Sequence, residues 1–103
     1  LKEVLQEISV KSSENLSVAD MAKFCGWSSS HFMRWFKKMT GDSFTSYVND
    51  RRLAEAAEAL CQTDDKILTI AQDAGFMNLS NFNRQFKKRY GVTPREYREM
   101  IGI

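Results

Sequence analysis

Residues Gly75–Tyr90, with the sequence GFMNLSNFNRQFKKRY, join a glycine–aromatic turn to a helical pattern that ends in a basic cluster. An earlier stretch, Gly26–Lys38, has the sequence GWSSSHFMRWFKK and the same order of features. A short apolar segment precedes each glycine, so each region is predicted to form one helix, a tight turn and a second helix. The rest of the chain can be interpreted as support for two copies of this arrangement.

The two copies align residue by residue. An offset of 49 pairs Ala22 with Ala71 and Gly26 with Gly75, and the second copy then gains one residue. Because the helix–turn–helix pattern occurs only twice, the sequence predicts a duplicated module and not a solenoid, which needs at least about three units. At an offset of 50, eight further positions of the first copy are identical to their counterparts: Ser30, Phe32, Arg34, Phe36, Lys37, Lys38, Gly41 and Tyr47.

Bulk composition limits the class of protein. A chain of 103 residues with 43% apolar residues predicts one compact domain, or two very small domains that share a core. Its apolar runs are too short to cross a membrane, and no signal peptide is evident. The first residue is not Met, which is compatible with a domain of a longer protein. Cys25 and Cys61 lack the partners of a zinc site or a disulfide framework, so we expect buried, reduced thiols and no cofactor.

The distribution of charge is more informative than the net charge of +2. Residues 84–98 contain six basic residues and a single acid, Glu96, and residues 31–41 contain three basic residues and no acid. Basic charge is therefore concentrated on the two repeated helices, as binding to an anionic polymer requires.

Periodicity and capping residues predict an all-α fold with seven helices. Ser17 and Thr93 are typical helix N-caps, and Gly26 is typical of a helix end. The predicted helices span residues 2–12, Val18–Cys25, Ser29–Met39, Ser43–Cys61, Ile67–Ala74, Leu79–Tyr90 and Pro94–Met100. We expect one helix-turn-helix unit in residues 1–42, a linker helix in residues 43–62 and a second unit in residues 63–103. The linker lacks Pro and Gly, so it should be a stiff helix that is roughly 28 Å long.

Apolar residues at helical spacing give the predicted core. Aromatic residues recur every three or four positions in the two repeated helices, which favours a core over a platform for single-stranded nucleic acid. The predicted core positions are Leu1, Val4, Leu5 and Ile8; Phe32, Trp35, Phe36 and Met39; Phe44, Tyr47, Val48, Ala54, Ala57 and Leu60; and Leu79, Phe82, Phe86 and Tyr90. The pattern of the fifth helix is given by Ile67, Leu68, Ile70, Ala71 and Ala74.

The opposite face of each repeated helix is small, polar and basic, as in a helix-turn-helix that binds DNA. An arginine can bind guanine or a phosphate, an asparagine can bind adenine, and lysines add salt-sensitive phosphate contacts. The alternatives are solvated or ion-paired arginines, helix capping by Ser29 and Ser80, and plain exposure; His31 is expected to pack at a helix start or to donate to a phosphate. The candidate DNA-binding residues are Ser29, Ser30, Met33, Arg34, Lys37 and Lys38 in the first copy, and Leu79, Ser80, Asn81, Asn83, Arg84, Lys87 and Lys88 in the second.

Three motifs in order make the chain resemble the AraC/XylS family of bacterial transcription regulators over about Ser17–Met100. They are Ile67-x-x-Ile70-Ala71-x-x-x-Gly75-Phe76, Phe82-x-Arg84-x-Phe86-Lys87-Lys88 and Gly91-x-Thr93-Pro94-x-x-Tyr97-Arg98. Trp27, Met77 and Leu79 depart mildly from the family's usual residues.

The resemblance implies seven helices, with two helix-turn-helix units joined by a long helix. It also implies that both recognition helices enter successive major-groove segments on one face of double-stranded DNA, and the expected linker length is close to one DNA turn of about 34 Å. Further expectations are recruitment of RNA polymerase as an activator, an effector-binding or dimerisation domain elsewhere in a longer protein, and a place at the nucleoid in the bacterial cytoplasm.

The sequence also bears on two other classes of function. A helical protein-interaction module without DNA binding is the main alternative, because a fold does not fix a function. An enzyme is disfavoured, since the sequence offers no nucleophile–base pair, no metal-binding cluster and no phosphate-binding loop.

Overall fold

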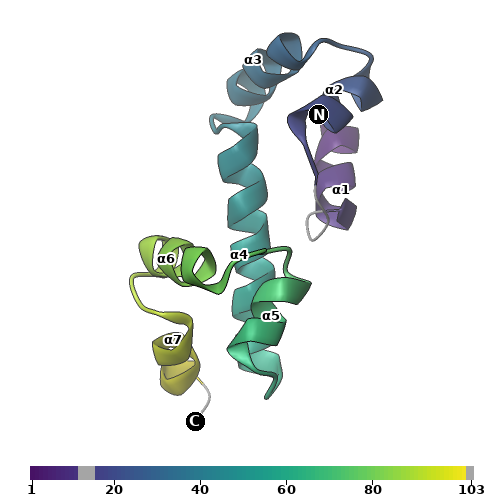
Figure 1. The fold of residues 1–103 in the computed structure, drawn as a ribbon. Helices are drawn as coiled ribbons and strands as arrows, with labels where there is room; N and C mark the ends of the chain where they lie inside the picture. The colour runs from purple at the N-terminus through teal and green to yellow at the C-terminus, as the bar shows by residue number, and fades with distance from the viewer. Residues whose placement is uncertain (12–15, 102–103) are drawn as a thin grey trace. The chain divides into compact units, whose positions relative to one another are not determined.

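The structure is a computed structural model that describes residues 1–11 and 16–101. Within these residues the chain forms seven α-helices and no strand, which confirms the predicted all-α fold (Figure 1). Most predicted ends are correct to within one residue, and the expected end of the first helix at residue 12 lies outside the described residues. The helices are α1 (Lys2–Lys11), α2 (Val18–Cys25), α3 (Ser29–Thr40), α4 (Phe44–Gln62), α5 (Ile67–Asp73), α6 (Leu79–Tyr90) and α7 (Pro94–Ile101).

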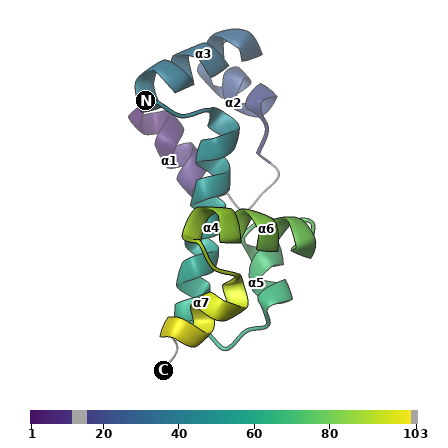
Figure 2. The same cartoon turned by 90° about the vertical axis from the view of Figure 1, so that its left-hand side faces the viewer.

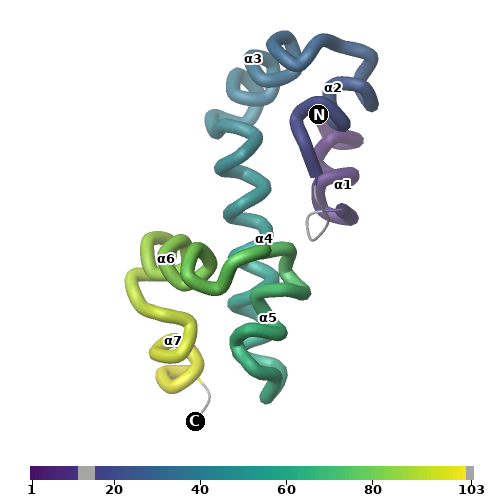
Figure 3. The backbone as a smooth tube through the Cα atoms, in the orientation of Figure 1, coloured from purple at the N-terminus to yellow at the C-terminus, as the bar shows by residue number. Residues whose placement is uncertain are grey.

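The chain divides into two compact units, Leu1–Arg51 and Arg52–Ile103. The boundary falls inside α4, which runs as one continuous helix in the tube of Figure 3. The first half of α4 therefore belongs to unit 1 and the second half to unit 2. Each unit has a hydrophobic core of its own.

Two phenylalanines of α3 form the centre of the core of unit 1. Phe32 and Phe36 are both 0% exposed, and they pack against Phe44 at the start of α4. Phe44 meets both rings edge to face, with centroid distances of 5.4 and 5.6 Å. Burying such side chains stabilises the fold by about 1.5–3 kcal/mol each. The remaining buried members of this core are Val4, Ile8, Met21, Ala22 and Val48.

Unit 2 repeats this plan with Phe82 and Phe86 of α6, which are also 0% exposed. Phe86 packs edge to face against Tyr97 of α7 with 5.3 Å between ring centroids, and Phe76 packs on Phe82 at 5.0 Å. Within this unit α5, α6 and α7 surround the second half of α4, as the rotated view in Figure 2 shows. The core also contains Leu53, Ala56, Ala57, Leu60, Ile70, Ala71 and Ala74.

The buried stripe of several helices is narrower than predicted. Met39 is 51% exposed, and Leu1 and Leu79 are each 38% exposed, so the expectation that they belong to the core is wrong. In α3 and α6 the phenylalanine pair already fills the space toward the neighbouring helices. Further apolar residues at helical spacing therefore fall at the edge of the core.

Two other predictions of burial also fail. In α4 the buried positions after Val48 are Leu53, Ala56, Ala57 and Leu60, and Ala54 is exposed because one residue turns it by about 100° from Leu53. Cys61 is exposed, whereas Cys25 is half-buried and burial raises the pKa of its thiol. Both cysteines are free in the structure.

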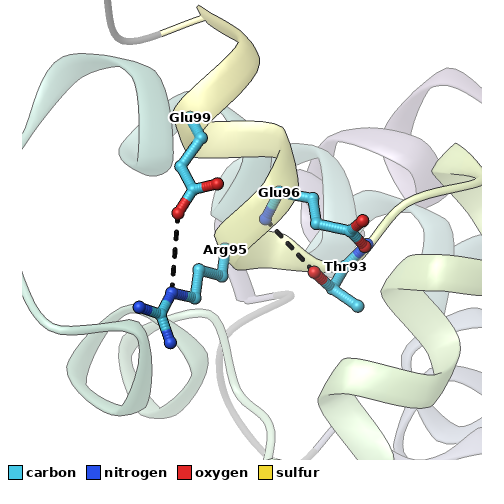
Figure 4. A network of polar contacts seen from close by, with 4 residues as sticks. All are labelled: Thr93, Arg95, Glu96 and Glu99. Carbon is cyan, nitrogen blue, oxygen red and sulfur yellow. Dashed lines mark hydrogen bonds and ion pairs between the residues drawn. The ribbon is translucent and has the colours of Figure 1, made fainter.

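The start of α7 confirms the capping predicted from its sequence. Thr93 Oγ1 accepts a hydrogen bond from the Glu96 amide at 3.1 Å, and the Thr93 amide donates to Glu96 Oε1 at 3.0 Å (Figure 4). Pro94 occupies the first helical position, where no amide hydrogen is needed. This capping box fixes where the chain enters α7, whose Tyr97 then packs on the core.

Candidate nucleic-acid interface

A glycine turn orients α3 on α2 in unit 1. Gly26, with φ of 74°, ends α2 in the left-handed region, which favours glycine. Its amide donates to the Lys23 carbonyl at 3.1 Å, and the Trp27 amide donates to the Ala22 carbonyl at 2.9 Å. These two bonds satisfy the last carbonyls of α2, and α3 starts only three residues later.

The same turn recurs in unit 2. The Gly75 amide donates to the Gln72 carbonyl at 3.0 Å, and the Phe76 amide donates to the Ala71 carbonyl at 2.9 Å. The second turn contains one more residue before the helix cap, Met77, whose side chain is 99% exposed. The extra residue of the second copy therefore lies on the surface and leaves the core pattern unchanged.

The N-caps of α3 and α6 are Ser28 and Asn78. Ser28 Oγ accepts from the His31 amide at 3.2 Å, and Asn78 Oδ1 accepts from the Asn81 amide at 2.9 Å. Ser29 and Ser80 already lie inside the helices, so helix capping is not the role of either hydroxyl. Both side chains are exposed.

The candidate DNA-binding residues lie on the surface of each unit, away from the buried phenylalanines. Arg34 and Arg84 are exposed, and so are the four lysines at 37, 38, 87 and 88. Met33 is 46% exposed, Ser30 is exposed, and Asn81 and Asn83 are half-buried. In each unit the structure thus brings its predicted set to one helix, accessible from outside.

Neither α3 nor α6 contains an acidic residue. Their last turns are basic and their first turns carry no acid, whereas α2 and α7 have Asp20 and Glu96 near their starts. The positive end of the helix dipole is therefore not neutralised by a carboxylate on either repeated helix. Such a surface is suited to an anionic ligand.

The two arginines differ in their surroundings. Arg84 Nη2 donates to Asn81 Oδ1 at 2.9 Å, a contact that the sequence pattern did not predict although the spacing i,i+3 is typical of such pairs. Within the described residues Arg34 has no side-chain partner, and neither arginine forms an ion pair. His31 packs at the start of α3 as predicted, because its ring stacks on Trp27 with 4.4 Å between centroids.

Residues 21–100 match the family described as a helix-turn-helix domain. The regulatory protein PocR of Salmonella typhimurium is 37% identical over 101 residues, which are 98% of this chain and 33% of PocR. A solved AraC-type transcriptional regulator from Chromobacterium violaceum superposes with a TM-score of 0.88 at 30% identity, covering 96% of this chain and 88% of that one. The chain belongs to the AraC family of transcription regulators.

This AraC-type domain is similar to shorter relatives as well. PqrA of Proteus vulgaris, a probable transcription factor, is 38% identical over 93 residues, which are 90% of this chain and 76% of PqrA. By contrast, the chain spans about a third of PocR. The predictions of the AraC family and of a DNA-binding transcription regulator are confirmed, and the family is not one of enzymes. In residues 1–11 and 16–101 no helix has the length and apolar character needed to cross a membrane.

Proposed function

We propose that this AraC-type domain binds double-stranded DNA with sequence specificity, and that α3 and α6 enter successive major-groove segments of one duplex. The observation that supports this most is the pair of acid-free, exposed helix faces, which are identical at Ser30 and Ser80 and at Arg34 and Arg84. An exposed helix that follows a tight glycine turn is the element that helix-turn-helix proteins insert into the major groove.

Each type of side chain has a distinct role in this proposal. Arg34 and Arg84 bind the O6 and N7 atoms of guanine, for which the guanidinium has the matching donors. Ser29, Ser30 and Met33 in unit 1, and Leu79, Ser80 and Asn83 in unit 2, contact neighbouring base edges or thymine methyl groups. Lys37, Lys38, Lys87 and Lys88 contact phosphates, which adds affinity that does not depend on sequence.

The continuity of α4 supports engagement of both helices at once. Its 19 residues contain no Pro or Gly, and at 1.5 Å per residue they are roughly 28 Å long. This length is close to the repeat of about 34 Å between successive major-groove segments on one side of a duplex.

The regulatory role follows from membership of the family. We infer that the domain acts as an activator that recruits RNA polymerase in the bacterial cytoplasm. The additional length of relatives such as PocR provides room for an effector-binding or dimerisation domain.

The first experiment is selection of duplexes from a random library with the chain itself, followed by titration of the selected duplex. Arg84→Ala should cost about 1–3 kcal/mol of binding free energy and relax the preference at one base pair. Arg34→Ala should do the same at a second base pair about one helical turn away. Lys87→Ala should weaken binding to every duplex equally and lower the salt slope by about one.

Arg95→Ala is the matched control, because Arg95 is an exposed arginine of α7 outside the proposed interface. The Arg95→Ala variant should bind the selected duplex with the affinity of the original chain. If Arg34→Ala and Arg84→Ala each weaken binding to every duplex equally, these arginines contact phosphates and do not read bases. Failure of the chain to bind any duplex in a salt-dependent way would reject DNA binding and favour a protein-interaction module.

A further inference from the structure

The Asn81–Arg84 hydrogen bond has a defined direction. A guanidinium has donors only, so the amide oxygen of Asn81 must face Arg84 and the amide nitrogen must point elsewhere. The two residues lie three positions apart on α6, where side chains are neighbours on the helix surface. One N–H of Arg84 Nη2 is used by this bond, and the other donors of the guanidinium remain for a ligand.

Asn81 is available for this contact because another residue caps the helix. Asn78 Oδ1 accepts from the Asn81 main-chain amide, so the Asn81 side chain is not needed at the helix start. Asn81 is half-buried, whereas Arg84 is exposed. The guanidinium of Arg84 is therefore bonded to a side chain that is less exposed than itself.

Unit 1 has the same arginine without this support. At the position equivalent to Asn81 stands His31, whose ring is stacked on Trp27 with an interplanar angle of 27°. The Arg34 guanidinium has no side-chain partner in the described part of the chain. The two units therefore present the same charged group in two different surroundings, hydrogen-bonded to Asn81 in unit 2 and without a side-chain partner among the described residues in unit 1.

We propose that Asn81 is a positioning residue for Arg84, which makes unit 2 the more selective of the two units toward its base pair. This inference rests on the proposed binding of α6 in a major groove. A guanidinium that is already oriented loses less freedom when it binds the two acceptors of guanine, and it fits other base pairs less readily. Arg34 can adjust to different acceptors, so unit 1 discriminates less.

Part of the test needs no DNA. In the free chain, nitrogen-15 relaxation of the arginine Nε groups should show Arg84 more ordered than Arg34. Asn81→Ala should make Arg84 as mobile as Arg34, while the thermal unfolding midpoint changes by a few degrees at most. Equal mobility of the two arginines in the unsubstituted chain would overturn the inference, whatever the chain binds.

The second part is a double-mutant cycle on the duplex selected from a random library. Asn81→Ala should lower discrimination at the base pair read by Arg84 by about fivefold, and it should have little further effect once Arg84 is alanine. Asn81→Asp keeps an acceptor oxygen at this place, so discrimination should be retained while binding to all duplexes weakens through the added negative charge. The matched cycle of His31→Ala and Arg34→Ala should be additive within about twofold.

The outcomes separate this inference from the proposed function. If Asn81→Ala relaxes a different base pair and is additive with Arg84→Ala, Asn81 reads a base itself and the positioning role is wrong. Additive loss on all duplexes would also overturn it. If the unsubstituted chain selects no duplex, the proposed function fails instead, and the relaxation measurement still decides whether Asn81 orders Arg84.

Discussion

The Nη1 atom of Arg98, on α7, donates to the main-chain carbonyl of Asp65 at 2.7 Å. The same guanidinium reaches the carbonyls of Thr63 at 3.1 Å and Leu60 at 3.3 Å. These carbonyls belong to the end of α4 and to the segment that leads to α5, and the last turn of α4 has no basic residue of its own. Arg98 thus supplies a positive charge to the negative end of α4. Although it belongs to the basic stretch 84–98, its charge serves the fold of unit 2.

We expect Arg98→Met to lower the free energy of unfolding by about 1–2 kcal/mol, because three hydrogen bonds from a charged group are lost and water replaces them only in part. Arg98→Lys should recover less than half of this loss, since an ammonium cannot reach all three carbonyls. Urea denaturation provides the measurement. The control is Arg95→Met, whose exposed pairing with Glu99 at 3.6 Å should be worth less than about 0.5 kcal/mol. Equal effects of the two Met substitutions would contradict the capping role.

Because each unit has its own core, a cavity in one core should first loosen the helices of that unit. Phe86→Ala and Phe36→Ala each remove a ring that is fully buried and should cost about 3–5 kcal/mol. Phe86 belongs to the core of unit 2 and Phe36 to that of unit 1. Amide hydrogen exchange should therefore lose protection first in α5–α7 for Phe86→Ala, and first in α2–α3 for Phe36→Ala. Met77→Ala is the exposed control and should leave amide protection unchanged in both units. If both phenylalanine variants lose protection in the same helices, the two cores are not separate.

The sequence predicts most of this fold because its strongest signals are local. Glycines at 26 and 75 mark turns, Thr93 and Glu96 mark a helix start, and each signal acts within a few residues. The width of a buried stripe is different, because it depends on how many neighbours cover a helix. Met39 and Leu68 have the right spacing for a core but lie at its edge.

Helix α4 shows a second limit of periodicity. Its two halves pack in different cores, so Val48 and Leu53 do not continue a single stripe and Ala54 falls on the exposed side.

At the candidate interface, the pattern predicts which face is exposed but not which side chains bond to each other. The Asn81–Arg84 pair depends on a rotamer, and the sequence does not set it.

The carboxylate of Glu96 makes the free energy of unfolding depend on pH in the acid range. Two hydrogen bonds with Thr93 lower the pKa of Glu96 below its ordinary value of 4.5. The bond from the Thr93 main-chain amide has the larger effect, and the bond with the Thr93 side chain has the smaller one. A lowered pKa in the folded state means that the stabilisation is present above the unfolded value and is lost as pH falls through the folded value. Thermal unfolding between about pH 7 and pH 3 should show Glu96→Gln less stable at neutral pH and less sensitive to acid than the original chain. Glu99→Gln, outside the capping box, should keep the acid sensitivity; if it removes as much as Glu96→Gln does, the assignment to Glu96 is wrong.

Three consecutive serines at 28–30 allow a matched test of capping against binding. Ser28 Oγ accepts from the His31 amide, so Ser28→Ala should cost about 1 kcal/mol of stability. Ser29 lies inside α3 with its side chain exposed, so Ser29→Ala should change stability by less than about 0.5 kcal/mol. In unit 2, Asn78→Ala and Ser80→Ala similarly compare a cap with a residue inside the helix, although Ser80 aligns with Ser30 and not with Ser29. Thermal denaturation and duplex titration on the same samples separate the roles: the cap variants should lose stability, whereas the variants inside the helices should keep stability and bind the selected duplex more weakly. If Ser29→Ala destabilises as much as Ser28→Ala, α3 starts one residue later in solution, and the groove-facing positions shift with it.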